Sequence, residues 1–130
     1  WGDGVMTREQ FAKQWAERAE QDWTLTQQVS AEELPPPVSF HAQQCAEKYM
    51  KALLVFRGQE APRTHELHEL AEALGDDALL AMAEELEWLS KFCIWGRYPV
   101  GEVTADDARR AVEIAGRVRE FCRREMSLEG

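Results

Sequence analysis

The chain has few of the residues that usually carry out catalysis or hold metals. Its three histidines are His41, His65 and His68, and no histidine follows them. It also lacks a glycine-rich phosphate loop, a serine nucleophile elbow and any cysteine pair with metal-ligand spacing. His65 and His68 are three residues apart, but without a His-Glu-x-x-His pattern we expect no metal and no cofactor. The sequence therefore argues against a free-standing enzyme.

Long apolar runs are also missing. No stretch approaches the ~18–20 apolar residues that span a bilayer, and no apolar N-terminal segment resembles a secretory signal. The three cysteines, Cys45, Cys93 and Cys122, are odd in number and far apart, which indicates buried, reduced thiols rather than a disulfide framework. We therefore expect a cytoplasmic protein that does not contact a membrane.

Positive charge is scarce as well. The chain has 15 Lys and Arg against 24 Asp and Glu, which gives a net charge of −9. Affinity for nucleic acid comes mainly from clustered Lys and Arg, so a general nucleic-acid-binding role does not fit. A local basic site remains compatible with this composition.

Helical periodicity is the main positive signal. Apolar residues recur every three to four positions in five segments, and no segment alternates as a strand does. The expected helices cover residues 7–29, 38–57, 65–74, 78–95 and 105–125. Such helices with short connections predict an all-α, antiparallel up-and-down bundle of four to five helices. We expect one domain, residues 7–126, between a flexible extension at 1–6 and a flexible tail at 127–130.

Local signals predict several helix ends. Thr7 and Gln10 have the spacing of a capping box, and Thr104 with Asp107 three residues later opens the last helix. Thr64 is expected to cap the third helix. The apolar face of the first helix is expected to comprise Phe11, Trp15, Ala19 and Trp23.

Three consecutive prolines occupy positions 35–37, after the first helix. Proline lacks an N–H and clashes with the preceding helical turn, so these residues cannot continue a helix. We interpret them as a stiff polyproline connector, with a ligand for a proline-reading module as the alternative.

A polar strip follows one edge of the second helix. His41, Gln44, Lys48 and Lys51 lie on one helix face over roughly 15 Å at 1.5 Å per residue. The strip is either a solvated edge, with an ion pair between Glu47 and Lys51, or a binding surface.

Residues 95–99, Trp-Gly-Arg-Tyr-Pro, combine two aromatic rings, an arginine and two helix breakers. Arginine with aromatic residues is typical of protein interfaces and of sites that stack on bases and bind phosphate. A third interpretation is a turn in which Arg97 complements a helix C-terminus.

Three motifs resemble the HEPN domain family. Residues 40–54, Phe-His-Ala-Gln-Gln-Cys-Ala-Glu-Lys-Tyr-Met-Lys-Ala-Leu-Leu, are similar to the family's second helix, His-Ala-Gln-Gln-Ala-Ala-Glu-Lys-x-x-Lys-Ala-Leu. Residues 63–67 are similar to its Thr-His-Asp-Leu step, and residues 97–99 match its Arg-Tyr-Pro motif. The motifs occur in family order, and the resemblance covers about residues 7–125.

This resemblance implies a helical bundle that dimerises and pairs with a minimal nucleotidyltransferase, in a toxin–antitoxin-like module, and contributes to a nucleotide site. Other HEPN domains are metal-independent ribonucleases, in which a histidine follows an arginine by four to six residues. No histidine follows Arg97, so we expect a non-catalytic subunit. The alternative is a diverged ribonuclease toxin that uses Arg97 with His41 or His65.

The candidate residues for binding a nucleotide or a partner are His41, Gln44, Lys48, Arg97 and Tyr98. If the second and fourth helices run antiparallel, His41 and Arg97 converge in one concave patch, together with Lys48 and Tyr98. Arginine pairs with phosphate or carboxylate through two parallel bonds, and Tyr98 could stack on a base or fill a partner's pocket. Alternatively, Arg97 only pairs with a nearby carboxylate such as that of Glu47.

We predict a homodimer at micromolar concentration. Five Trp and five Phe are many large apolar side chains for a chain of this size to bury alone. Light scattering should therefore give about twice the chain mass of 14.9 kDa. A mass near that of a single chain throughout the micromolar range would contradict the prediction.

Overall fold

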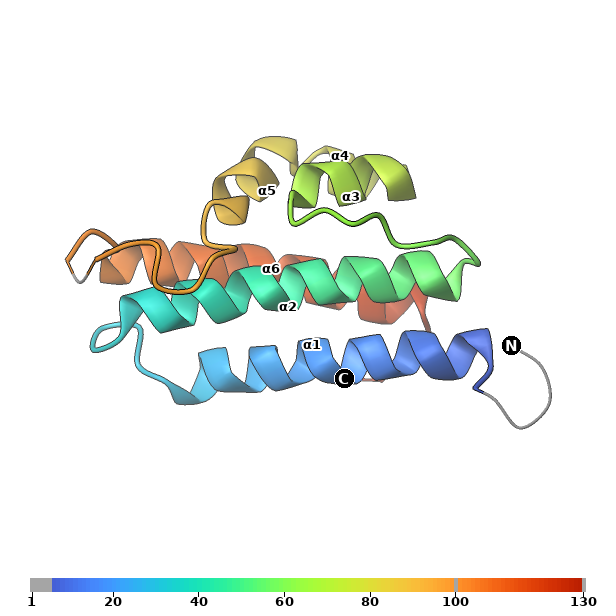
Figure 1. Cartoon of the computed structure of the whole chain (residues 1–130), viewed down its shortest axis with the longest axis horizontal. Coiled ribbons are helices and arrows are strands. Elements are labelled where there is room, and N and C mark those ends of the chain that lie inside the picture. Colours follow the sequence, from blue (N-terminus) through green and yellow to red (C-terminus); the bar gives the residue numbers. More distant parts are fainter. Residues whose placement is uncertain (1–5, 100, 130) are drawn as a thin grey trace.

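The computed structural model describes residues 6–99 and 101–129, and this part of the chain contains six helices and no strand (Figure 1). The helices are α1 (Arg8–Gln28), α2 (Pro35–Phe56), α3 (Leu67–Leu74), α4 (Asp77–Leu80), α5 (Ala83–Ser90) and α6 (Ala105–Glu125). The predicted all-α helical bundle is confirmed. Residues 1–5 of the expected N-terminal extension and Gly130 of the expected tail lie outside the described residues.

Helix α2 is the centre of the molecule. Helices α1 and α6 pack along it, and α3, α4 and α5 form a layer on the side away from α1 (Figure 1). Helix α1 runs antiparallel to α2, whereas α6 runs in the same direction as α2, because the α3–α5 layer carries the chain back. The start of α2, the segment that follows α5 and the start of α6 consequently lie at one end of the bundle (Figure 1).

The face of α1 that is buried against the rest of the bundle differs from the predicted one. It is formed by small residues, since Ala12, Ala16 and Ala19 are at most 3% exposed. The larger rings of Trp15 and Trp23 are only partly buried and pack at the edges. Small side chains at a helix contact allow the two axes to approach closely, so the alanines occupy the centre.

The longest outer helices begin where the capping signals predicted. The Thr7 hydroxyl accepts the N–H of Gln10 at 3.1 Å, and the Gln10 side chain accepts the N–H of Thr7 at 2.8 Å. Thr104 and Asp107 make the same reciprocal pair at 3.0 and 3.1 Å. These bonds satisfy N–H groups that a helix start otherwise leaves without partners.

The interpretation of residues 35–37 as a connector is wrong. Pro35 to Pro37 form the first turn of α2, after Leu34 as N-cap. The first N–H groups of a helix have no partner within the helix, and the fixed φ of proline suits this turn. The three prolines therefore begin the helix and lose no hydrogen bond by doing so.

The predicted helix at 78–95 is divided into α4 and α5, and α5 already ends at Ser90. No glycine or proline marks the break at Ala81 and Met82. Leu79 before it and Leu86 after it are both fully buried. Tertiary packing thus overrides a continuous helical pattern.

Helix α3 also starts later than predicted, and Thr64 is not its N-cap. The Thr64 hydroxyl accepts the N–H of Glu66 at 3.0 Å, which forms a turn before the helix. The N–H of Leu67, the first helical residue, donates to the hydroxyl of Ser90 at 2.8 Å. A side chain from α5 therefore satisfies a donor that a local cap was expected to satisfy.

A charged network links α1, α2 and α6. The Arg119 guanidinium donates to both oxygens of Glu20, and the Tyr49 hydroxyl donates to the same carboxylate. Arg123 donates to the Tyr49 oxygen at 3.0 Å. Burial alone raises the pKa of Glu20, but the hydrogen bonds from Arg119 and Tyr49 outweigh it and hold that pKa below its usual value.

The lowered pKa of Glu20 predicts pH-dependent stability. A carboxyl whose pKa is lower in the folded state stabilises the fold above its unfolded pKa, and this contribution is lost as pH falls through the folded pKa. Glu20→Gln should therefore lower the free energy of unfolding at pH 7, and the difference from wild type should narrow below about pH 4. Urea denaturation at both pH values measures this. The exposed carboxyl in Glu120→Gln is the control, and a Glu20→Gln deficit independent of pH would contradict the account.

Candidate functional site

A hollow of about 570 Å³ opens at the end of the bundle where α2 begins. Its walls are the first turn of α2, the segment that follows α5, and Val103 just before α6. Among the described residues, four large hydrophobic side chains are exposed, and three of them border this hollow: Leu34, Ile94 and Trp95, at 51%, 54% and 59%. Exposed apolar surface gathered around a concavity is typical of a binding site.

Arg97 and Tyr98 both line the hollow. The Tyr98 ring packs edge-on against Phe92, with 5.7 Å between the ring centroids. Arg97 is exposed and forms no ion pair with a carboxylate of the described residues. Its positive charge is therefore available to a ligand.

Two other candidates, His41 and Lys48, share a carboxylate that the sequence analysis missed. The oxygens of Asp22, in α1, lie 2.7 Å from Nδ1 of His41 and 2.7 Å from Nζ of Lys48. Since a carboxylate only accepts hydrogen bonds, Nδ1 of His41 carries the proton. Asp22 is 7% exposed, and it follows Ala19 by three residues on the buried face of α1. A carboxylate on a buried helix face needs a hydrogen-bonding or cationic partner. The position of Asp22 on that face is therefore the sequence signal that could have revealed its role.

The candidate residues fall into two groups that meet at Trp95. The Trp95 ring centroid lies 5.3 Å from that of Phe40 and 6.2 Å from that of His41, and Trp95 also lines the hollow with Arg97 and Tyr98. Gln44 and Lys48 do not line the hollow. The Gln44 amide donates to Oε1 of Gln43 at 2.7 Å, and Lys48 is bound to Asp22.

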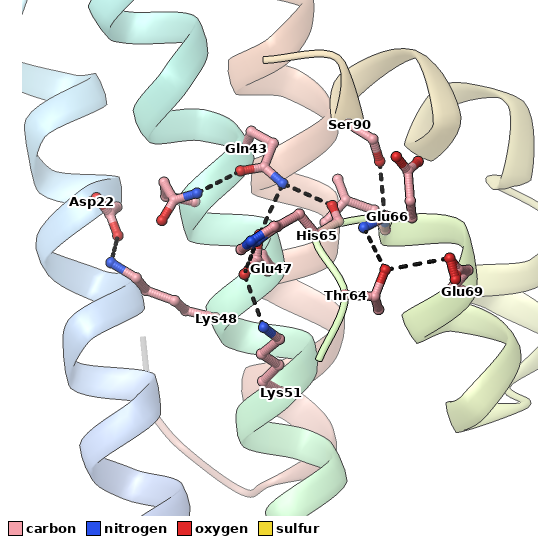
Figure 2. Close-up of polar contacts among 12 residues, drawn as sticks. Asp22, Gln43, Glu47, Lys48, Lys51, Thr64, His65, Glu66, Glu69 and Ser90 are labelled. Atoms are coloured by element: carbon pink, nitrogen blue, oxygen red, sulfur yellow. Dashed lines mark hydrogen bonds and ion pairs between the residues drawn. The ribbon is translucent and has the colours of Figure 1, made fainter. Parts of the chain in front are cut away.

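The carboxylate of Glu47 is buried and accepts hydrogen bonds from three side chains (Figure 2). It accepts from the Gln43 amide at 3.1 Å, from the Lys51 ammonium at 2.9 Å and from Nδ1 of His65 at 3.1 Å. Gln43 also donates to the carbonyl oxygen of His65 at 3.2 Å. The predicted Glu47–Lys51 ion pair is thus present, but it is buried instead of lying on a solvated edge. The expected alternative of an Arg97–Glu47 pair is absent.

The expectation that all three thiols are buried holds for two of them. Cys45 and Cys122 are buried, and burial raises the pKa of both thiols. Cys93 is half-buried, and its pKa is raised mainly by burial and also by Glu66.

No group of three or more side chains that could hold a metal ion occurs in residues 6–99 and 101–129. No helix in that part of the chain is long and apolar enough to cross a membrane.

The chain belongs to the HEPN domain family, because the family's sequence profile matches residues 12–125. The fold is similar to that of TT1696 from Thermus thermophilus, at 25% identity and a TM-score of 0.73, over 88% of this chain and 97% of that one. It is also similar to ST0689, described as an archaeal HEPN homologue, at 24% identity, with the same TM-score and coverage. No curated protein matches the chain.

We predict that Asp22→Asn destabilises the protein. The substitution removes a nearly buried charge and replaces one of the two acceptor oxygens by an NH2 donor, so His41 or Lys48 loses its acceptor. This should lower the free energy of unfolding by about 1–3 kcal/mol. Urea denaturation at pH 7 measures the change. Asp106→Asn is the matched control because that carboxylate is 89% exposed, so its loss should be clearly smaller. Equal losses in the two variants would contradict the assigned role of Asp22.

Proposed function

We propose that this chain is a non-catalytic HEPN subunit that dimerises and binds a nucleotidyltransferase-domain protein, in a module of the toxin–antitoxin type. The contact surface comprises the hollow with Arg97 and Tyr98 and the neighbouring face of α2 with His41, Gln44 and Lys48. The nucleotide site to which this surface contributes is completed by the transferase, which supplies the groups that bind the phosphates. The observation that carries the proposal is the apolar hollow with an unpaired arginine in its wall.

The shape of the hollow supports a binding role. Three prolines with fixed φ form one wall, and in another wall the rings of Phe92 and Tyr98 pack against each other. Binding sites with preformed walls lose little conformational entropy when they are filled. An exposed Trp and an Arg are also the side chains most often found at the energetic centre of protein interfaces.

The arrangement of the histidines favours this function over the ribonuclease alternative. Nδ1 of His41 is held by Asp22, and Nδ1 of His65 is held by Glu47. Both rings thereby have a structural role that links α2 to a neighbouring segment. Neither ring is hydrogen-bonded to Arg97 in the described part of the chain.

The proposal predicts that a nucleotidyltransferase-domain protein is encoded beside this chain's gene and that it forms a complex with this chain. The two purified proteins should co-elute in size-exclusion chromatography. Arg97→Glu should weaken the complex at least about tenfold, because it replaces the one cation among the described residues of the hollow by a negative charge, which would repel an acidic partner group. Arg124→Glu is the control, since Arg124 lies in the last turn of α6, at the other end of the bundle (Figure 1).

Two results would contradict the proposed function. One is the absence of any complex with the wild-type chain at micromolar concentrations. The other is cleavage of a mixed-sequence RNA by the purified chain that disappears in Arg97→Ala, since this would assign Arg97 a catalytic role.

A further inference from the structure

The start of α2 lacks the free backbone N–H donors that most helix starts present. A helix N-terminus presents free N–H groups and partial positive charge, and it commonly binds phosphate or carboxylate. In α2, Pro35, Pro36 and Pro37 have no N–H, and the N–H of Val38 donates to the carbonyl oxygen of Leu34 at 3.3 Å. The wall formed by this first turn therefore contributes no backbone donor to a bound anion.

The remaining walls are also poor partners for a phosphate. Aromatic and aliphatic side chains such as Phe92, Ile94 and Val103 form most of them. Among the described residues that line the hollow, Arg97 is the one cation, and Glu33 at the rim carries the opposite charge. A nucleotide phosphate carries up to about two negative charges and binds where several donors converge. One arginine, in a hollow that also carries a glutamate, does not provide that.

We propose that the hollow binds a segment of a partner protein that inserts apolar side chains and pairs one carboxylate with Arg97. The apolar walls and the three exposed side chains at the rim match large apolar anchors. The unpaired guanidinium matches a single carboxylate, which it binds through two parallel hydrogen bonds. This inference rests on the proposed function and specifies how the transferase partner is recognised.

A second copy of this chain fits the hollow less well. A two-fold symmetric pair through this surface would place hollow against hollow and Arg97 near its symmetry mate, which brings like charges together. A concave surface needs a protruding occupant, so a second copy would have to present a different surface. Such head-to-tail contacts close into rings or continue as filaments. The homodimer is therefore expected to use another face of the bundle.

The proposed preference of the hollow for apolar side chains and one carboxylate can be tested without knowing the partner. A displayed library of random 12-residue peptides is selected on the wild-type chain and counter-selected on Trp95→Ala. The enriched peptides should combine large apolar side chains with an Asp or Glu. For a synthetic peptide from this set, Arg97→Ala should weaken binding about tenfold, and so should replacing the peptide's carboxylate by an amide. The two changes together should weaken it no further, because each removes the same ion pair.

Arg124→Ala is the matched control and should leave the peptide affinity unchanged. Enrichment of peptides without an acidic residue, additive effects of the two changes, or no enriched peptide at all would overturn the inference. Binding of AMP or ATP to the isolated chain that is lost in Arg97→Ala would overturn it as well. If the peptides bind through apolar side chains and a carboxylate but the transferase does not bind, the inference about the hollow stands and the proposed partner is wrong.

Discussion

The carboxylate of Glu47 lies near the middle of α2 and is almost completely shielded from solvent, so it has to be paired within the protein. Leaving such a charge without partners would cost about 3–5 kcal/mol. Its donors come from α2 itself, Gln43 and Lys51, and from His65 in the segment that leads into α3. Pairing Glu47 therefore attaches the α3–α5 layer to the central helix (Figure 2). Because the chain after α5 carries Trp95 and Arg97, the position of the hollow depends on this buried carboxylate.

Asp22 repeats this arrangement on the other side of α2. It joins α1 to two residues of α2, His41 and Lys48, so both side chains already have a partner within the protein. The motif of residues 40–54 thus consists largely of side chains that hold helices together. Arg97 differs, because it is exposed and has no carboxylate partner in residues 6–99 and 101–129. The side chains that hold helices together and the arginine proposed to bind a partner therefore lie in different segments of the chain.

The sequence predicted those features that local chemistry determines. The capping residues Thr7 and Thr104 marked the starts of α1 and α6, because their side chains bond to their own helix. It did not predict that three prolines begin α2, since a proline-rich stretch before a helix and a proline-rich first turn have the same local sequence. The break between α4 and α5 and the capping of Leu67 by Ser90 depend on contacts between distant residues. Arg97 and Tyr98 could be selected as candidates from their local motif. The apolar walls of the hollow and the role of Asp22 could not be predicted, because they too depend on contacts between distant residues.

A hollow with apolar walls, proline in place of helix N–H donors, and one unpaired arginine has the chemistry of a protein-docking site. The most direct test is photo-crosslinking from the rim, with Trp95 replaced by p-benzoylphenylalanine in the full chain and the nucleotidyltransferase present. The account predicts a crosslink to a transferase segment that contains apolar residues and a carboxylate, competed by excess unlabelled wild-type chain. A crosslink that forms only between two copies of this chain would contradict it.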